Sequence, residues 1–140
     1  MKSFAAKDAK DAKENMNEEE IGRLVIDASM KVHTALGAGL LETIYETCLA
    51  HELEKQGAVV RKQVALPLVY DELRLDNAFR IDLLVDDKVV VEIKAIDNLL
   101  PVHTAQLLSY LKLGKYKLGF LLNFNVVHMK DGIKRMVNRL

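Results

Sequence analysis

The fold of this chain is decided by Arg80–Ile96, which reads RIDLLVDDKVVVEIKAI. Two runs rich in Val, Ile and Leu surround a short charged turn, and this composition favours two β-strands joined as a hairpin. Each run also carries charge where a buried strand normally has none, at Asp82 in the first and at Glu92 and Lys94 in the second. Because ionised groups inside an apolar strand are costly unless a partner compensates them, the hairpin indicates a bound cation.

The length of the turn decides whether the two acids meet. Side chains alternate faces along a strand, so Glu92 and Lys94 point the same way. A two-residue turn at Asp86–Asp87 would set Asp82 opposite Val91 and leave Glu92 on the other face. A loop of odd length, such as 86–88, a bulge or splayed strands would bring both acids together, and we predict one of these arrangements.

Opposed carboxylates repel unless a cation lies between them, and an oxygen-rich pair suits Mg²⁺ or Mn²⁺, which also bind substrate phosphates. Lys94 would then orient or deprotonate the attacking water, or stabilise the charge that develops at phosphorus. The alternative is a Glu92–Lys94 surface pair on an edge strand, since same-face pairs of this kind are common.

Two helices supply further candidates. His103, Gln106 and Tyr110 share one face of a helix that follows the acidic strand, where they would hold a metal-bound water or a phosphate. The alternative is a polar rim with Tyr110 half in the core. Glu42 and Glu46 are spaced by four residues on an earlier helix, and a nearby cation would remove their repulsion. The alternative is that both glutamates are solvated on the helix surface and bind no cation.

The composition fits one domain of 140 residues with a real core, because half of the residues are hydrophobic. No apolar run approaches the roughly 18 residues of a membrane span, and no secretory signal is present, so we expect a cytoplasmic protein without a membrane partner. The single cysteine, Cys48, excludes an internal disulfide and Cys-rich zinc sites and is expected in the core. From Lys112 onward, seven basic residues stand against Asp131 alone, a net charge of +6 that suits nucleic acid or is simply a solvated surface.

The periodicity predicts a mobile leader over 1–17 and a single α/β domain over 18–140 with a mixed sheet and the element order ααβββαβα. Pro67 is expected at an edge or a bulge of its strand. The second helix is expected to bury Leu41, Ile44, Tyr45, Cys48 and Leu53. The predicted helices are Glu18–Leu36, about Leu40–Gln56, about Pro101–Leu113 and about Asp131–Asn138, and the predicted strands are Val59–Tyr70, Ala78–Val85, Val89–Ile96 and Leu118–Phe124.

Residues Gly39–Tyr45, GLLETIY, match the motif of the GxxExxY protein family, a branch of the PD-(D/E)XK nuclease superfamily, which the chain resembles from about Ile21 to Val137. The resemblance includes Asp82 with Glu92-x-Lys94 and a Gln106-x3-Tyr110 motif similar to that of RecB-type nucleases. The nominal proline before the aspartate is absent, because Arg80-Ile81 precede Asp82. The resemblance implies a restriction-endonuclease-like core, a mixed β-sheet flanked by helices.

The resemblance also implies roles for individual residues. Asp82 and Glu92 would bind Mg²⁺ with the Ile93 carbonyl as a further ligand, and Lys94 would be the catalytic lysine. A helix glutamate, Glu42 in the motif or Glu46 beside it, would complete the acidic cluster, and both remain candidates. Gln106 and Tyr110 would support the site or contact DNA.

The hypothesis that follows is a metal-dependent nuclease that hydrolyses DNA phosphodiester bonds by in-line attack of a metal-activated water. The alternatives are a non-catalytic module that binds nucleic acid or protein, and an assembly subunit of a larger system. Because a chain this small has little surface for gripping DNA, we expect a homodimer with two sites facing opposite strands.

Overall fold

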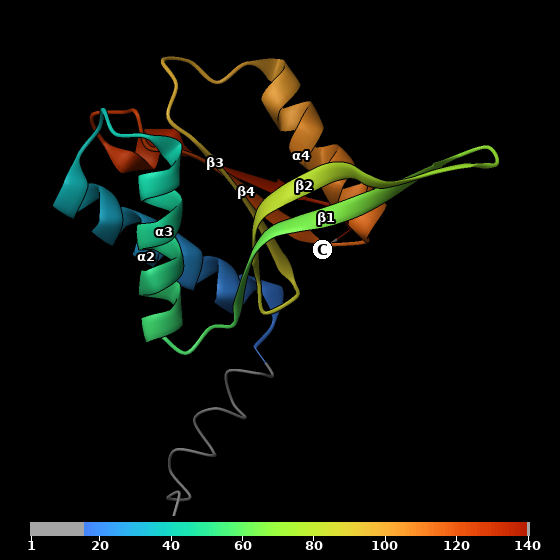
Figure 1. Cartoon of the computed structure of the whole chain (residues 1–140). Helices are drawn as coiled ribbons and strands as arrows, with labels where there is room; N and C mark the ends of the chain where they lie inside the picture. The colour runs from blue at the N-terminus through green and yellow to red at the C-terminus, as the bar shows by residue number, and fades with distance from the viewer. Residues whose placement is uncertain (1–15, 140) are drawn as a thin grey trace, which may run out of the picture.

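The computed structural model describes residues 16–139 and contains one five-stranded sheet in the order β1-β2-β3-β4-β5 (Figure 1). Neighbouring strands are antiparallel except β3 and β4, which run parallel and are connected through α4. The predicted α/β class, a mixed sheet flanked by helices, is confirmed. The elements are α2 (Glu18–Leu36), α3 (Glu42–Lys55), β1 (Val60–Tyr70), β2 (Leu73–Val85), β3 (Val89–Lys94), α4 (Pro101–Gly114), β4 (Leu118–Asn123), the 3₁₀ helix η1 (Met129–Gly132) and β5 (Ile133–Val137).

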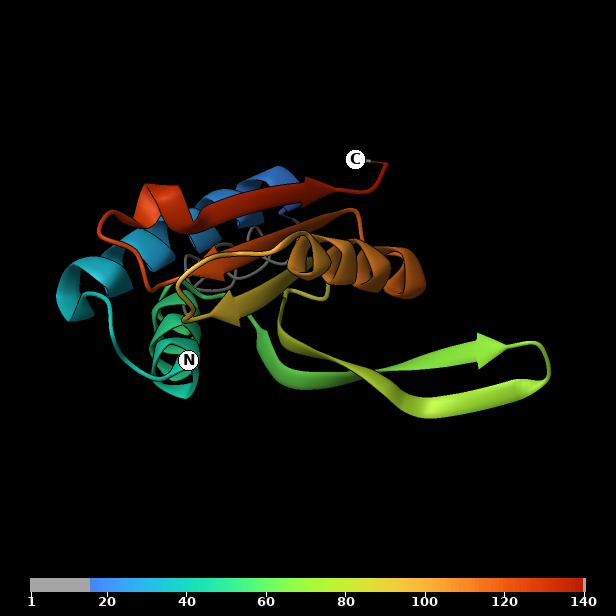
Figure 2. The ribbon, with the colours of Figure 1, turned by 90° about the horizontal axis from the view of Figure 1, so that it is seen from above.

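The two faces of the sheet carry separate apolar cores. Val91 and Ile93 of β3 point to the face that α2 and α3 cover, whereas Val90 points to the face that α4 covers. Figure 2 shows α4 lying across that second face of β3 and β4. Since side chains alternate along β3, Glu92 and Lys94 share the face of Val90 and lie on the side of α4.

Helix α2 has the predicted bounds. Asn17 caps its first turn, because its side chain accepts the Glu20 N–H at 2.9 Å, and Gly37 ends it with a positive φ of 70°. The predicted leader lies outside the described residues apart from Met16 and Asn17. None of the described helices combines the length and the apolar character that a membrane span requires.

Helix α3 buries a different stripe from the predicted one. Tyr45 and Leu53 are buried, as expected, but Cys48 is only half-buried against the core, and Leu41 and Ile44 are 72% and 40% exposed. The helix begins at Glu42, so Leu41 lies before its first turn. The buried face follows a spacing of four residues from Tyr45, which leaves Ile44 beside it rather than on it. Leu49 and Ala50 complete the buried face of the helix.

Strand β1 lies at one edge of the sheet. It shows the expected irregularity at Pro67, where the pairing with β2 shifts between Leu66 and Leu68. Strand β2 begins at Leu73, five residues before the predicted start at Ala78. The extra residues pair with the end of β1 as far as Tyr70↔Leu73, so the two strands form a ribbon that projects from the body of the molecule (Figures 1 and 2).

The predicted C-terminal helix over 131–138 is wrong. This segment forms the end of η1 and the strand β5, which pairs antiparallel with β4 from Leu118↔Val137 to Leu122↔Ile133. The two half-buried apolar residues Ile133 and Met136 are three positions apart, a spacing that resembles a helix. The buried strand β4 needs backbone partners on its open edge, and that tertiary demand outweighs the local pattern.

Candidate active site

The loop between β2 and β3 has the odd length that the acidic pair requires. Val85 pairs with Val89, so three residues, 86–88, form the turn, and its first two have φ values of 51° and 54°. The ladder continues to Leu83↔Val91, and the next positions in the same register are Asp82 and Glu92. The predicted odd register is therefore confirmed.

The strands also splay at this point. Ile81 belongs to the core under α4 and Leu83 to the core under α2 and α3, although both have the same parity, so the alternation of β2 breaks at Asp82. Side chains replace the ladder here. The Asp82 carboxylate accepts the backbone N–H of Ile93 at 2.8 Å, and the Glu92 carboxylate accepts the backbone N–H of Asp82 at 3.3 Å. The two acids are thus held side by side by the backbone.

The Ile93 carbonyl points towards the same gap. The Lys94 carbonyl accepts the N–H of Phe124 at 2.9 Å and therefore faces β4. Because backbone groups of successive residues point to opposite edges of a strand, both the N–H and the carbonyl of Ile93 face the β2 side, where Asp82 lies. Two carboxylates and one carbonyl thus converge on the place where β2 leaves β3.

The electrostatics of Glu92 are unusual for an acid. Its side chain lies in a buried residue, only 5% exposed, and burial together with the neighbouring Asp82 carboxylate raises the pKa of Glu92 to about 9 from its ordinary value of 4.5. Lys94 on the same face acts in the opposite direction. A cation at this position would remove the repulsion between the acids and favour the ionised form of Glu92.

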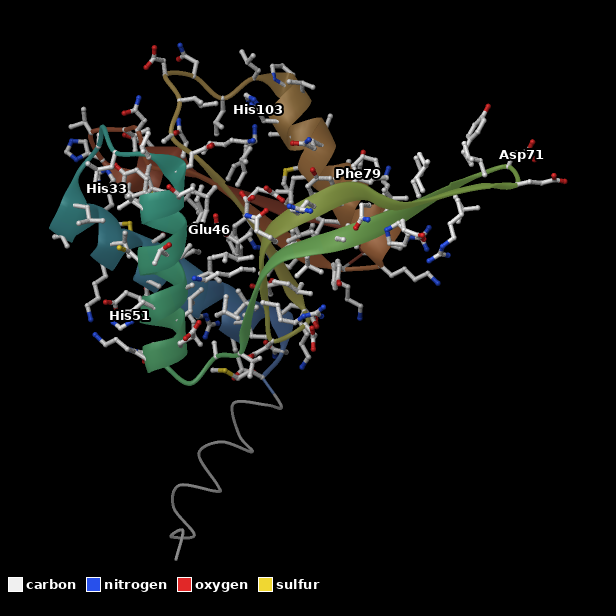
Figure 3. The ribbon with its side chains drawn as sticks, viewed as in Figure 1. His33, Glu46, His51, Asp71, Phe79 and His103 are labelled. Carbon is white, nitrogen blue, oxygen red and sulfur yellow. The ribbon has the colours of Figure 1, made fainter. Side chains whose placement is uncertain are left out.

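Tyr110 of α4 forms the apolar wall of the site. It is 5% exposed, its ring centroid lies 5.5 Å from that of Phe79, and burial followed by the charges of Glu92 and Asp82 raises the pKa of its hydroxyl. Gln106, one turn earlier, is exposed. His103 lies at the start of α4 (Figure 3), where its Nδ1 accepts the Leu100 N–H at 2.9 Å. Within the predicted stripe, Tyr110 is the residue on which the charges of both acids act.

Glu46 lies on α3 (Figure 3) and is linked to the acidic pair through a side chain of β1. The Gln63 side chain donates to the Glu46 carboxylate at 3.0 Å and to the Asp82 carboxylate at 3.4 Å, so one amide joins two acids. Glu42 is exposed, and within residues 16–139 no hydrogen bond joins its side chain to another residue. The sequence did not indicate Gln63 as a site residue, because a polar residue on an exposed edge strand is common. Its positive φ of 53° could not be predicted from the sequence either.

The glycine and tyrosine of the Gly39–Tyr45 motif shape the connection between α2 and α3. Gly39 has a φ of 96°, which favours glycine. The buried Tyr45 hydroxyl donates to the Gly37 carbonyl at 2.6 Å and accepts the Leu40 N–H at 3.1 Å, and its ring stacks on Phe124 at 4.5 Å. These contacts fix the start of α3 and hence the position of Glu46.

The exit of β3 is held by a residue that the sequence did not single out. Asn123 is 3% exposed, its amide donates to the Ile96 carbonyl at 2.9 Å, and its oxygen accepts the Ile96 N–H at 3.1 Å. Through these two bonds Asn123 fixes the chain just beyond Lys94.

His33 is a packed histidine, because its Nε2 lies 2.8 Å from the Val126 carbonyl oxygen.

The donors at the site fit a hard divalent cation. Asp82, Glu92 and the Ile93 carbonyl offer only oxygen, the ligand type of Mg²⁺ and Mn²⁺, and the buried Glu92 beside Asp82 calls for a positive charge. Among the described residues, no three side chains of His, Cys, Asp or Glu gather closely enough to hold a metal by themselves. The third acid, Glu46, is joined to the pair only through Gln63.

A comparison with family models matches residues 19–136 to the family described as the PD-(D/E)XK nuclease superfamily. No curated protein and no solved structure matches the chain. The matched range contains the whole sheet to Met136 and all the acids described above. Since it covers far more than half of the chain, the chain belongs to the PD-(D/E)XK nuclease superfamily.

Proposed function

We propose that this chain is a metal-dependent nuclease that hydrolyses phosphodiester bonds of DNA. The observation that carries the proposal is the pair Asp82 and Glu92, held together by backbone hydrogen bonds with Glu92 buried and Lys94 on its face. A buried acid with a raised pKa beside a second acid is a typical feature of catalytic sites. Family membership supports nuclease chemistry in general, and the Gly39–Tyr45 motif supports the GxxExxY branch.

The carboxylates of Asp82 and Glu92 and the carbonyl of Ile93 would hold one Mg²⁺ or Mn²⁺. When bound, the ion would polarise the scissile phosphate and lower the pKa of a water molecule. We assign the helix acid to Glu46 rather than Glu42, because Gln63 already joins Glu46 to Asp82. Glu46 would accept hydrogen bonds from water at the edge of the site.

Lys94 supplies the positive charge on the reacting side. Its side chain is half-buried on the face of Glu92, so its ammonium can position a water molecule or donate to a phosphate oxygen. Tyr110 and Phe79 exclude bulk water from the opposite wall, which strengthens these interactions. The exposed Gln106 lies at the rim, where it is free to contact the DNA backbone.

The test is cleavage of plasmid, single-stranded and branched DNA with Mg²⁺ or Mn²⁺ by the wild-type chain and by Asp82→Ala and Lys94→Ala variants. Lys31→Met is a matched control, because Lys31 pairs with Glu52 at 3.2 Å on the far helices. We expect both site variants to lose cleavage and the control to retain it. Equal activity in all four proteins would contradict the assignment of the site, and cleavage that persists in EDTA would contradict the metal.

One observation favours a second candidate, a binding module without catalysis. The two acids already have a structural role, because their carboxylates accept hydrogen bonds from the backbone N–H groups of Ile93 and Asp82. Titration calorimetry separates the candidates: a nuclease binds Mn²⁺ in a way that depends on Asp82 and Glu92. A binding module holds DNA with equal affinity whether these acids are intact or replaced by their amides, and it does not cleave.

A further inference from the structure

The ribbon formed by the end of β1 and the start of β2, which we call the arm, is the least covered part of the fold. It comprises Leu68–Leu75, with the pairs Leu68↔Leu75, Val69↔Arg74 and Tyr70↔Leu73. The arm projects beyond the body of the molecule in two perpendicular views, and Asp71 marks its tip (Figures 1, 2 and 3). A two-stranded ribbon alone is marginally stable in water, so this length of arm needs a surface to rest on.

The arm has one apolar and one charged face. Because paired residues share a face and alternate residues of one strand do too, Leu68, Tyr70, Leu73 and Leu75 lie together. Tyr70, Leu73 and Leu75 are 74%, 56% and 44% exposed. The opposite face carries Val69 and Arg74, and Arg74 pairs with Asp76 at 2.7 Å.

The apolar face continues the core of the molecule. At the base of the arm, just before the register shift at Pro67, Leu66 pairs with Phe79; Leu66 belongs to the core under α4 and Phe79 packs against that core. That cover ends with α4 at Gly114, whereas the apolar face runs on to Tyr70. Apolar side chains that remain exposed beyond the helix that covers the rest of their face indicate an interaction surface.

The charge of the arm indicates which kind of partner it binds. The arm carries two acids at its tip, Asp71 and Glu72, against Arg74, a net charge of −1 that disfavours a phosphate backbone as the partner. The complementary charge lies on this same chain. A hollow of about 500 Å³ at the end of α4 is lined by Lys112, Lys115, Lys117 and Arg139 together with Tyr116 and Asn138, and no carboxylate of residues 16–139 pairs with these four cations.

We propose that the arm binds a second copy of this chain. The apolar faces of two arms pack together about a two-fold axis, tip to base, so that the same residues meet in both directions. Because α4 covers the base of that face, the acidic tip of each arm reaches the end of the partner's α4, where Lys112 and Lys115 stand. This interface is independent of the nuclease chemistry, since none of its residues lies in the acidic site.

Sedimentation equilibrium of the full chain tests the apolar contact. We expect the wild type to sediment at twice its chain mass of 15.8 kDa and the double variant Tyr70→Ser, Leu75→Ser to sediment at 15.8 kDa. Val69→Ser is the matched control, because Val69 is 60% exposed on the opposite face of the same ribbon, and it is expected to stay dimeric. A wild type that is monomeric at 100 times the concentration used for cleavage, or equal masses for both variants, would overturn the proposal.

Charge reversal tests the tip. The pair Asp71→Lys, Glu72→Lys and the pair Lys112→Glu, Lys115→Glu should each weaken dimerisation at least tenfold, and all four changes in one chain should restore it. Simple addition of the two losses would count against the contact. Fluorescence anisotropy with a labelled duplex checks the other occupant: a monomeric wild type whose DNA affinity falls in the Tyr70/Leu75 variant but not in Val69→Ser would assign the arm to nucleic acid and reject the second copy.

Discussion

The backbone N–H of Asp82 donates to the Glu92 carboxylate at 3.3 Å, while the Asp82 carboxylate takes the N–H of the residue after Glu92. Two acids thus occupy the place of a missing rung of the β2–β3 ladder. Their separation is set by backbone rather than by flexible side chains, which is the kind of preorganisation that a metal centre requires. The same contacts bury Glu92, and that burial has measurable consequences.

The first consequence is a pH dependence of stability without metal. Burial and the Asp82 carboxylate raise the pKa of Glu92 from 4.5 to about 9, so between these values the folded chain holds a proton that the unfolded chain has released. The free energy of unfolding therefore falls as pH rises through this window, by at most about 1.4 kcal/mol per pH unit. Urea unfolding in EDTA from pH 5 to 9 measures the slope, and Glu92→Gln should flatten it. Parallel slopes for the two proteins would contradict the prediction.

The second consequence concerns metal binding and stability in one variant. Glu92→Gln removes a buried acid whose ionisation is costly, so at pH 8 in EDTA it should be more stable than the wild type. It also removes a proposed ligand. Mn²⁺ at about 100 times its Kd should stabilise the wild type by about 2.7 kcal/mol and this variant by almost nothing. Thermal unfolding with and without Mn²⁺ measures both effects; Asp87→Asn, an exposed acid in the turn, is the control that should respond as the wild type does.

The two helix glutamates are separated by a matched pair of variants. Glu46→Gln loses the carboxylate that Gln63 joins to Asp82, and we expect the affinity for Mn²⁺ or the cleavage rate to fall about 10- to 100-fold. Glu42→Gln changes an exposed side chain one turn away and should alter neither quantity. Titration calorimetry and single-turnover cleavage give the two readings. The reverse ranking would return the role to the glutamate of the motif.

The motif tyrosine should matter for folding rather than for chemistry. Tyr45→Phe keeps the ring stacked on Phe124 but removes the hydroxyl that bonds Gly37 and Leu40. Buried backbone groups then lose their partner, and the free energy of unfolding should fall by about 1–3 kcal/mol. Urea unfolding measures the loss. Affinity for Mn²⁺ should stay unchanged at temperatures where the variant is folded, and a large loss of affinity with unchanged stability would show a different role.

The sequence by itself determined the features that depend on local periodicity. Local periodicity predicted the bounds of α2, Glu18–Leu36, and the parity of Asp82 and Glu92 predicted that an odd loop would bring them together. Both rest on the fixed repeats of helix and strand, which need no knowledge of distant residues. The family motif adds the superfamily, which the match over residues 19–136 confirms.

The tertiary structure decided what depends on partners far away in the chain. The segment after η1 is a strand because the open edge of β4 binds it, against a spacing of Ile133 and Met136 that looks helical. Glu46 of α3 is linked to Asp82 of β2 because the Gln63 side chain of β1 donates to both carboxylates. Backbone hydrogen bonds across a sheet and a side-chain amide between two elements join residues that no local pattern connects, so only the folded chain reveals them.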